Sequence, residues 1–313
     1  MASNKIKVWL GRADGYEPDA LARQAGEALQ AVGFRPSAGS SVLVKPNLLF
    51  ADPQGIAYTH PLLVRAACLY LLDCGCRVSV SDSPGFGRAS RVAAVTGIAS
   101  ALPGGLRVVE MGPKVKKPLS QGGSLGIASR ALEADVILNL PKLKAHRMMR
   151  LSGAVKNLYG CVSGVEKALL HSKHGDKERA GVQLFPSLIA DLLNCLPPCV
   201  ALMDGITAMH KSGPMNGVPL GLGFVAAGAS CVALDTAVYT LLDKKPELFP
   251  IWVELQRRGA SGAFAGEIEW LGLSKEDVDL SAFELPEALA SESFNPGRLM
   301  LSGIKRAMSY LHR

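Results

Sequence analysis

The chain has 313 residues, of which 48% are hydrophobic and 19% are charged, and no long low-complexity run interrupts it. This composition excludes an intrinsically disordered chain and is typical of a globular protein with a sizeable core. The formal charge of +7 is uneven, because residues 141–174 carry seven lysines and arginines against one glutamate, a local balance of +6. Such a cluster indicates an anionic ligand more than a generally basic surface.

The N-terminus and the cysteines indicate the cellular compartment of the protein. The first residues, MASNKIKVWLG, lack the apolar core of a signal peptide. The uncharged stretch at 219–234 is too short and too rich in glycine to span a bilayer. Seven cysteines, an odd number without framework spacing, indicate a reducing compartment. We therefore expect a cytoplasmic protein with no transmembrane segment.

Short β-branched runs alternate with helical patterns along the chain. The run at 5–11 precedes a helix that begins near Pro18 and ends at Gly33. A second strand at 41–49 precedes a helix from Thr59 to about Cys74. Further strands are predicted at 76–82, 106–111, 134–141, 199–205 and 221–227, with further helices after the turn SPGFG and at 230–243. The alternation predicts an α/β fold, a mostly parallel sheet flanked by helices, built as one unit or as two α/β lobes.

The residue pattern of the sequence changes near residue 245, where prolines, a tryptophan and then a polar segment follow. We expect an α/β domain over residues 1–245, with any two lobes meeting near 130–140, and a C-terminal extension over 246–313. The last 17 residues, GRLMLSGIKRAMSYLHR, have the spacing of a basic amphipathic helix. Such a helix docks on its own fold or on a twin subunit, and the alternatives are a redox partner or a membrane surface.

Four predicted strands end in polar residues: Lys45 with Asn47, Asp82 with Ser83, Lys142 with Lys144 and His146, and Asp204. Open parallel sheets bind ligands beyond the carboxyl ends of their strands, so we expect these side chains to share one site. In the turn after Asp82, Ser83, Gly85 and Gly87 would let backbone amides approach a phosphate or carboxylate.

Each of these features also has a plainer interpretation. Lys45 to Asn47 fits a strand exit with an Asn turn, and Asp82 fits an Asx turn. His60, at a helix start, fits a cap or a packed histidine. The functional interpretation rests on the four strand ends occurring together.

The basic segment 141–174 is the strongest signal, because its lysines interleave with apolar residues that would hold them to the body of the protein. Ser152 is expected to cap a helix that carries Lys156 about one turn inside. His146, His171 and His174 match no compact zinc spacing, and the local charge repels a cation, so no metal ligand is predicted. Tyr159 is the only aromatic residue of the segment, which argues against nucleic acid.

Cofactor motifs give little guidance. The sequence has no P-loop and no GxGxxG after a strand, so no cofactor is assigned. Cys161 lies close to the basic segment, where positive charge would favour its thiolate, although packing is the plainer interpretation.

The motifs VLVKPNLL, THP, SDSPG, LPKLKAH, SGAVKNLYG and MDGITAMHKSGPMNG occur in an order that resembles the family called domain of unknown function 362, over roughly residues 40–245. The recurring polar positions of that family fall here on Lys45, Asn47, His60, Asp82, Lys142, Lys144, His146, Lys156, Asn157, Gly160, Lys167, His171, Asp204 and Asp235. Some members carry a ferredoxin-like iron–sulfur segment, and its C-x2-C-x2-C spacing is absent here. His210 and Lys211 stand where the family often has an acidic residue and glycine.

The first functional hypothesis is an enzyme acting on a small anionic substrate, a carboxylate or a phosphate, by an isomerase, lyase or oxidoreductase step. The expected catalytic residues are His146, Lys144, Lys156, Asp204 and Asp82. The expected substrate-binding residues are Lys45, Asn47, His60, Ser83, Gly85, Lys142, Asn157, Lys167 and His171. The alternative is a non-catalytic carrier or assembly factor in iron–sulfur or cofactor metabolism, which would use Cys161 and the terminal helix.

Overall fold

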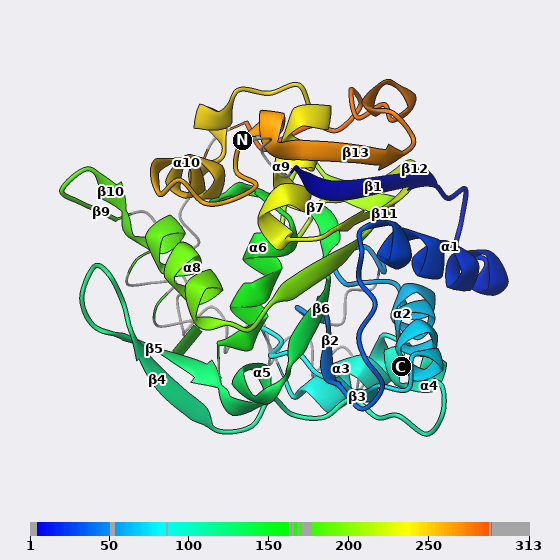
Figure 1. Cartoon of the computed structure of the whole chain (residues 1–313). Coiled ribbons are helices and arrows are strands. Elements are labelled where there is room, and N and C mark those ends of the chain that lie inside the picture. The colour runs from blue at the N-terminus through cyan, green and yellow to red at the C-terminus, as the bar shows by residue number, and fades with distance from the viewer. Residues whose placement is uncertain are drawn as a thin grey trace, which may run out of the picture.

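The computed structural model describes residues 5–50, 54–85, 87–162, 164, 166–167, 170, 174, 177–287 and 289. Within these residues, nine strands form one mixed sheet at the centre of the molecule (Figure 1). Its main path runs through β13 (Ile268–Gly272), β1 (Ile6–Arg12), β12 (Val218–Gly228), β11 (Cys199–His210), β6 (Val136–Leu140), β2 (Ser41–Pro46) and β3 (Arg77–Val80). Beyond β6, β11 also pairs with β7 (Lys142–His146), which pairs with β8 (Arg150–Ser152).

Most of the strand pairs in this nine-stranded sheet are parallel. Parallel pairs join β2 to β3, β2 to β6, β11 to β6, β11 to β7 and β1 to β13. The antiparallel pairs join β12 to β1 and to β11, and β7 to β8. The predicted α/β class, a mostly parallel sheet flanked by helices, is therefore confirmed.

Two strand predictions need correction. The candidate strand at 106–111 contributes only an isolated parallel bridge between Val80 and Val108. The start of the basic segment, expected to be a loop, is instead strand β7, because the chain turns at Pro141 and pairs again with β11. Pairing satisfies the backbone polar groups that a buried loop would leave without partners.

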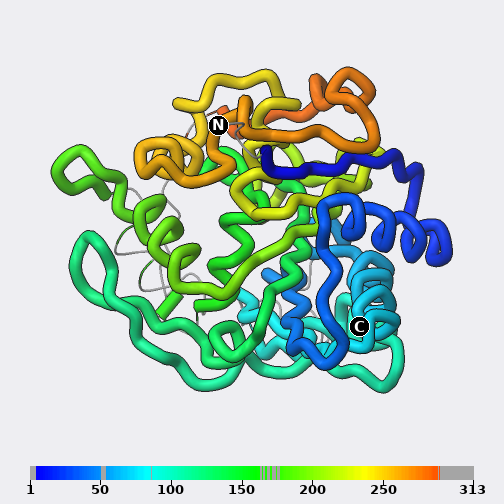
Figure 2. Tube along the Cα trace, in the orientation of Figure 1, coloured from blue at the N-terminus to red at the C-terminus, as the bar shows by residue number. Residues whose placement is uncertain are grey.

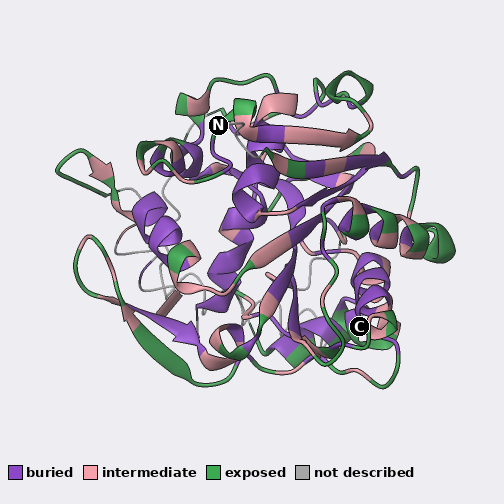
Figure 3. Ribbon diagram, in the orientation of Figure 1, coloured by how far each residue is buried: buried purple, intermediate pink, exposed green. Residues whose placement is uncertain are grey.

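Helices cover both faces of the sheet (Figures 1 and 3). On β2, Val42 and Val44 pack in one hydrophobic core and Leu43 packs in the other, as the alternation of a strand requires. The first core includes α1 (Pro18–Ala31), α2 (Pro61–Asp73), α3 (Ala89–Val95) and α4 (Ile98–Ala101). The second includes α6 (Ala154–Asn157), α8 (Leu184–Cys195), α9 (Cys231–Leu241) and α10 (Pro250–Arg257). Burial on both faces explains why the central strands read as continuous apolar runs.

Smaller elements lie around this body. The hairpins β4 (Lys114–Pro118) with β5 (Ser124–Ala128), and β9 (Glu178–Arg179) with β10 (Val182–Gln183), extend away from the sheet in Figure 2. The remaining short helices are α5 (Ser129–Glu133), η1 (Leu158–Cys161), η2 (Pro246–Leu248), η3 (Ala265–Glu267) and η4 (Lys275–Asp277).

The described part of the predicted extension is built into the sheet. Strand β13 lies at its edge and pairs with β1 from the other end of the chain. Strand β6, where two lobes were suggested to meet, pairs on both sides within the same sheet. The division into a domain and an extension remains a prediction, and the amphipathic helix at 297–313 lies outside the described residues. In the part of the chain that the structure describes, no helix is long and apolar enough to cross a membrane.

Candidate functional site

The polar strand ends converge at one edge of the sheet. Strands β2, β3, β6 and β11 are parallel neighbours along the sheet path, so their carboxyl ends lie on the same side. The paired register of β7 and β11 then sets Lys142 opposite Asp204. Five side chains gathered there, those of Lys45, Asp82, Lys142, Lys144 and Asp204, are each at most 3% exposed. We call them the buried cluster.

Lys45 and Asp82 form the first ion pair of the buried cluster. The Lys45 Nζ lies 2.7 Å from Asp82 Oδ1, and both side chains are buried. Asp82 Oδ1 accepts no hydrogen bond from the described residues, so this contact is chiefly electrostatic. Asp82 Oδ2 accepts a hydrogen bond of 2.9 Å from the backbone amide of Leu48. Asp82 therefore links strands β2 and β3 through their following loops.

Lys142 and Asp204 form the second ion pair, at 2.8 Å, and both side chains are almost fully buried. Asp204 also accepts hydrogen bonds from the Tyr16 hydroxyl at 2.8 Å and from the His60 backbone amide at 2.9 Å. The Tyr16 hydroxyl in turn accepts from Lys142 Nζ at 2.9 Å and from the Thr207 amide at 3.3 Å. Each charged group is thus compensated, as burial demands.

Lys144 differs from the other two buried lysines. Its Nζ donates to the Ala57 carbonyl at 2.8 Å, and no carboxylate of the described residues lies within ion-pair distance of it. Burial lowers the pKa of Lys144 well below its ordinary value, and the positive charge of Lys156 lowers it further. Asp82 acts in the opposite direction. Burial without a carboxylate partner therefore disfavours the ammonium form of Lys144.

Lys167 approaches the buried cluster from the basic segment. Its half-buried ammonium donates to the Ser83 carbonyl, and the Ser83 amide donates to the Gly160 carbonyl at 3.1 Å. Burial lowers the pKa of Lys167 to about 8, and Lys45 adds to the effect. The turn after β3 is thereby tied to the basic segment.

The other expected binding residues make structural contacts. The Asn47 amide donates to the Thr59 hydroxyl oxygen at 2.8 Å, and the Asn47 carbonyl accepts from the Thr59 amide at 3.0 Å. The Gly85 amide donates to the Leu49 carbonyl at 2.7 Å. The Asn157 side chain donates to Asn139 Oδ1 at 2.7 Å. These contacts hold the loops of the site together, and binding by these residues remains a prediction.

His146 lies at the end of β7, four residues along the strand from Lys142. Its Nδ1 accepts hydrogen bonds from the amides of Met148 at 3.1 Å and Met149 at 3.3 Å. That nitrogen cannot take up a substrate proton while these bonds hold. His171 lies outside the described residues.

The start of helix α6, which carries Lys156, is held by Asp235 and not by Ser152 as expected. The Asp235 carboxylate accepts from the amide of Ala154 at 2.6 Å and from that of Val155 at 2.9 Å. Gly153 occupies the capping position, where a Cβ atom would overlap the carboxylate. A carboxylate from distant α9 can satisfy both amides, which a serine hydroxyl cannot. Burial raises the pKa of Asp235 to about 7.

Cys161 lies in the core, in agreement with the packing interpretation and not with the alternative of a thiolate. Cys161 is fully buried, and burial raises the pKa of its thiol to about 12. Lys45 acts in the opposite direction but does not outweigh burial. Cys161 is therefore a neutral packing residue, as the plainer interpretation had it.

Tyr16 is the contact residue that sequence reasoning missed. Strand β1 is antiparallel to β12, and β12 is antiparallel to β11, so β1 and β11 point the same way. The loop after β1 therefore reaches the same edge of the sheet as the four recognised strand ends. The predicted strand at 5–11 is therefore a fifth strand end at this edge, and a polar contact residue is expected in the loop that follows it.

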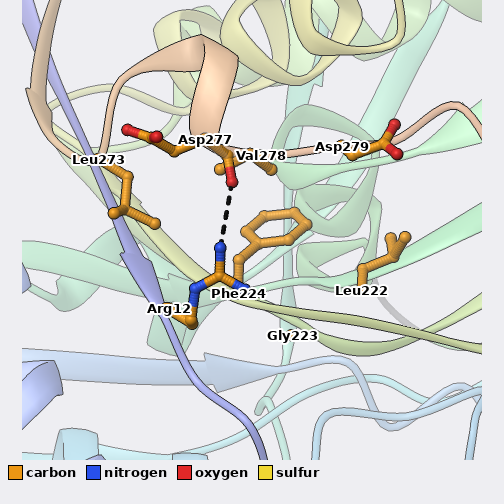
Figure 4. Close-up of a pocket in the computed structure, with 8 residues that line it drawn as sticks. All are labelled: Arg12, Leu222, Gly223, Phe224, Leu273, Asp277, Val278 and Asp279. Atoms are coloured by element: carbon orange, nitrogen blue, oxygen red, sulfur yellow. Dashed lines mark hydrogen bonds between the residues drawn. The ribbon is translucent and has the colours of Figure 1, made fainter.

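Two cavities lie near this end of β1. The larger, about 540 Å³, lies between the β1–α1 loop and α1, and Tyr16 lines it. The smaller, about 140 Å³, is shown in Figure 4, where Arg12 donates to the Asp277 carbonyl at 3.4 Å. No member of the buried cluster lines either cavity, but Tyr16 in the lining of the larger one contacts Lys142 and Asp204.

Replacing Gly160 tests how tightly the first ion pair is enclosed. In Gly160→Ala, the new Cβ atom would overlap Asp82 Oδ1 and Lys45 Nζ. We expect the free energy of unfolding, measured with urea, to fall by about 3 kcal/mol or more. Gly221→Ala is the control, because a Cβ atom there meets open space. Equal effects of the two substitutions would contradict the close packing around Asp82.

Tyr16 also shields His60. The two rings stack with centroids 3.5 Å apart, and His60 Nδ1 caps α2 by accepting from the Leu62 amide at 3.3 Å. Burial lowers the pKa of His60 to about 4. We expect Tyr16→Ala to raise this pKa toward the ordinary 6.5, while Tyr16→Phe leaves it low, in NMR titrations of the imidazole. A phenylalanine variant that shifts as far as the alanine variant would show that ring burial is not the cause.

The comparisons identify the family. The model of the domain of unknown function DUF362 matches residues 42–240, so the chain belongs to this family, as its motifs predicted. The thylakoid-associated protein sll1697 of Synechocystis is 31% identical over 305 residues, covering 95% of this chain and 93% of that protein.

Two solved structures are more distantly similar. One, from Thermotoga maritima, matches with 12% identity and a TM-score of 0.43, over 70% of this chain and 57% of its own. The other, the lactate racemase apoprotein of Thermoanaerobacterium thermosaccharolyticum, matches with 16% identity and a TM-score of 0.46, over 74% of this chain and 55% of its own. The chain thus spans little more than half the length of either structure.

Proposed function

We propose that this protein is an enzyme that acts on a small anion, a carboxylate or a phosphate, at the buried cluster. The observation that carries the proposal is the excess of buried lysines over buried carboxylates there. Three lysines, Lys45, Lys142 and Lys144, are buried with only two carboxylates, Asp82 and Asp204. A bound anion would accept hydrogen bonds from N–H groups that Lys142 and Lys144 leave without acceptors among the described residues, and it would be held without competition from water.

Lys144 is the best candidate for the proton acceptor in this site. An uncharged amine can take a proton from a substrate carbon or oxygen, and the fixed charges of Lys45 and Lys142 would stabilise the anion that forms. Because His146 Nδ1 is committed to backbone amides, the role first assigned to His146 passes to Lys144. Such a proton transfer occurs in reactions of the isomerase, lyase and oxidoreductase classes.

Anion binding by the intact protein tests the proposal. We expect inorganic phosphate or malonate to raise the melting temperature of the wild-type protein, because a ligand that binds only the folded state stabilises it. Lys144→Met should reduce the increase, whereas Lys116→Met, at an exposed position on β4, should not. If neither anion raises the melting temperature, the proposal fails.

The cellular location also remains a proposal. The cysteines, all free in the structure, motivated the expectation of a cytoplasmic protein. The name of the Synechocystis relative associates that protein with thylakoids, so attachment to a membrane surface is the competing location. Fractionation of native host cells distinguishes the two, because a cytoplasmic protein stays in the supernatant at low and at high salt.

A further inference from the structure

We propose that Lys144 acts as a nucleophile and forms an imine with a small anion that carries a ketone next to its carboxylate, a 2-oxo acid. This inference rests on the proposed function, since it names the substrate class of the same site. It assigns Lys144 a covalent role in place of simple proton transfer.

The contacts of the three buried lysines set Lys144 apart. Lys45 and Lys142 each face a carboxylate at 2.7–2.8 Å, which stabilises their ammonium forms. Lys144 has one hydrogen bond, to the Ala57 carbonyl, and an ammonium there would leave two buried N–H donors without partners among the described residues. The neutral amine leaves only one such N–H and has a lone pair on nitrogen, which is the nucleophilic form.

Burial and flanking positive charge act on Lys144 in the same direction. Both lower its pKa, with burial the larger cause. Lysines become nucleophiles in proteins under these two conditions, an apolar environment and a neighbouring cation. Lys156 is the largest source of this positive charge, and Lys142 and Lys45 add to it.

The strand geometry suits a 2-oxo acid. Lys142 and Lys144 are two residues apart on β7, so both side chains lie on the same face of the strand, about 7 Å apart at their bases. Lys142 donates to Asp204 and to Tyr16, and its third N–H has no acceptor among the described residues. A carboxylate bound there would bring the adjacent ketone carbon toward the Lys144 amine.

The chemical step balances without a further reactant. The nitrogen lone pair attacks the ketone carbon and forms a C–N bond. One proton of the amine and one proton from solvent are transferred to the ketone oxygen, which leaves as water, and the second amine proton stays on nitrogen. The product is a protonated imine, whose positive charge is offset by the carboxylate of the substrate. That cation then withdraws electrons from the neighbouring carbon, which favours loss of a proton or cleavage of a carbon–carbon bond.

Reductive trapping tests the inference. The full-length protein is incubated with pyruvate and sodium cyanoborohydride, and the adduct is located by mass spectrometry of peptides. We expect one reduced adduct on Lys144, at a rate that saturates with pyruvate concentration and falls when phosphate competes. Lys116 is the internal control, because an exposed lysine should react slowly and in proportion to pyruvate concentration.

Variants separate a lost nucleophile from a lost fold. Lys144→Met and Lys144→Arg should both abolish the adduct, and Lys144→Arg keeps a cation at the position. Circular dichroism of each variant, compared with the wild-type protein, confirms that it is folded. Lys116→Met should leave trapping at Lys144 unchanged.

The outcomes distinguish this inference from the proposed function. If pyruvate raises the melting temperature but Lys144 is not trapped above the level of Lys116, the imine is overturned and anion binding stands. If neither pyruvate nor phosphate raises the melting temperature and no adduct forms, both proposals are overturned. Saturable trapping at Lys144 supports both.

Discussion

Asp204→Ala is expected to lower the free energy of unfolding by about 3–5 kcal/mol, because it leaves the buried Lys142 ammonium without its counter-ion. The same substitution removes the acceptor of the Tyr16 hydroxyl and of the His60 amide. Urea unfolding at constant pH measures the loss. Because the variant is expected to be weakly folded, Asp204→Asn, which keeps the shape and one acceptor oxygen, provides a second measurement with a smaller loss.

An exposed ion pair provides the matched control. Lys211 and Glu284 lie 3.1 Å apart, but their side chains are 51% and 60% exposed. Glu284→Ala should therefore cost less than about 1 kcal/mol, since water already solvates both charges. If Asp204→Ala and Glu284→Ala cost the same, the Lys142–Asp204 pair is not isolated from solvent and the argument for a buried site fails.

Replacing the whole pair separates stability from function. A buried ion pair is often no more stable than apolar residues of similar volume. We therefore infer that Lys142→Met combined with Asp204→Leu regains much of the stability that Asp204→Ala loses, while anion binding is not regained. The Lys142–Asp204 pair would then serve anion binding and not the stability of the fold.

The sequence predicted the location of the buried cluster because strand ends are local signals. Lys45, Asp82, Lys142 and Asp204 each follow or end an apolar run, and parallel pairing brings such ends together. Which lysine faces which aspartate depends on register between strands that are distant in the chain. No local pattern encodes that register. Only the structure therefore shows that Lys144, unlike Lys45 and Lys142, has no carboxylate partner among the described residues.

Other errors have the same origin. Tyr16 was missed because β1 joins the sheet through β12, a pairing across most of the chain. The cap of α6 comes from Asp235, 81 residues from Ala154, so the local serine was chosen instead. At Cys161, by contrast, the packing interpretation agrees with the structure, because the effect of burial on the thiol outweighs that of the nearby positive charge. Local propensity is a weak guide where tertiary contacts supply the partner.

Lys144→Met is expected to raise the free energy of unfolding at pH 7 by about 1–2 kcal/mol, although it removes a hydrogen bond to Ala57. The gain arises because the unfolded wild-type chain regains a fully solvated ammonium at Lys144, whereas the folded protein disfavours it. Methionine has similar length and no charge to desolvate. Urea unfolding of the two proteins at pH 7 measures the difference, with Lys116→Met as the control for loss of a lysine.

The pH dependence of that difference identifies its cause. The folded pKa of Lys144 lies below its unfolded pKa, so between the two values the unfolded chain binds more protons and stability rises with pH. The wild-type protein should gain stability relative to Lys144→Met, by up to about 1.4 kcal/mol per pH unit, as the pH is raised from the folded pKa of Lys144 toward its unfolded pKa. A difference that stays constant would mean that Lys144 is equally charged in both states, and its role as a base or nucleophile would be lost. A protein that keeps a destabilising lysine in its core, and loses anion binding when the lysine is replaced, is one in which that lysine serves the reaction.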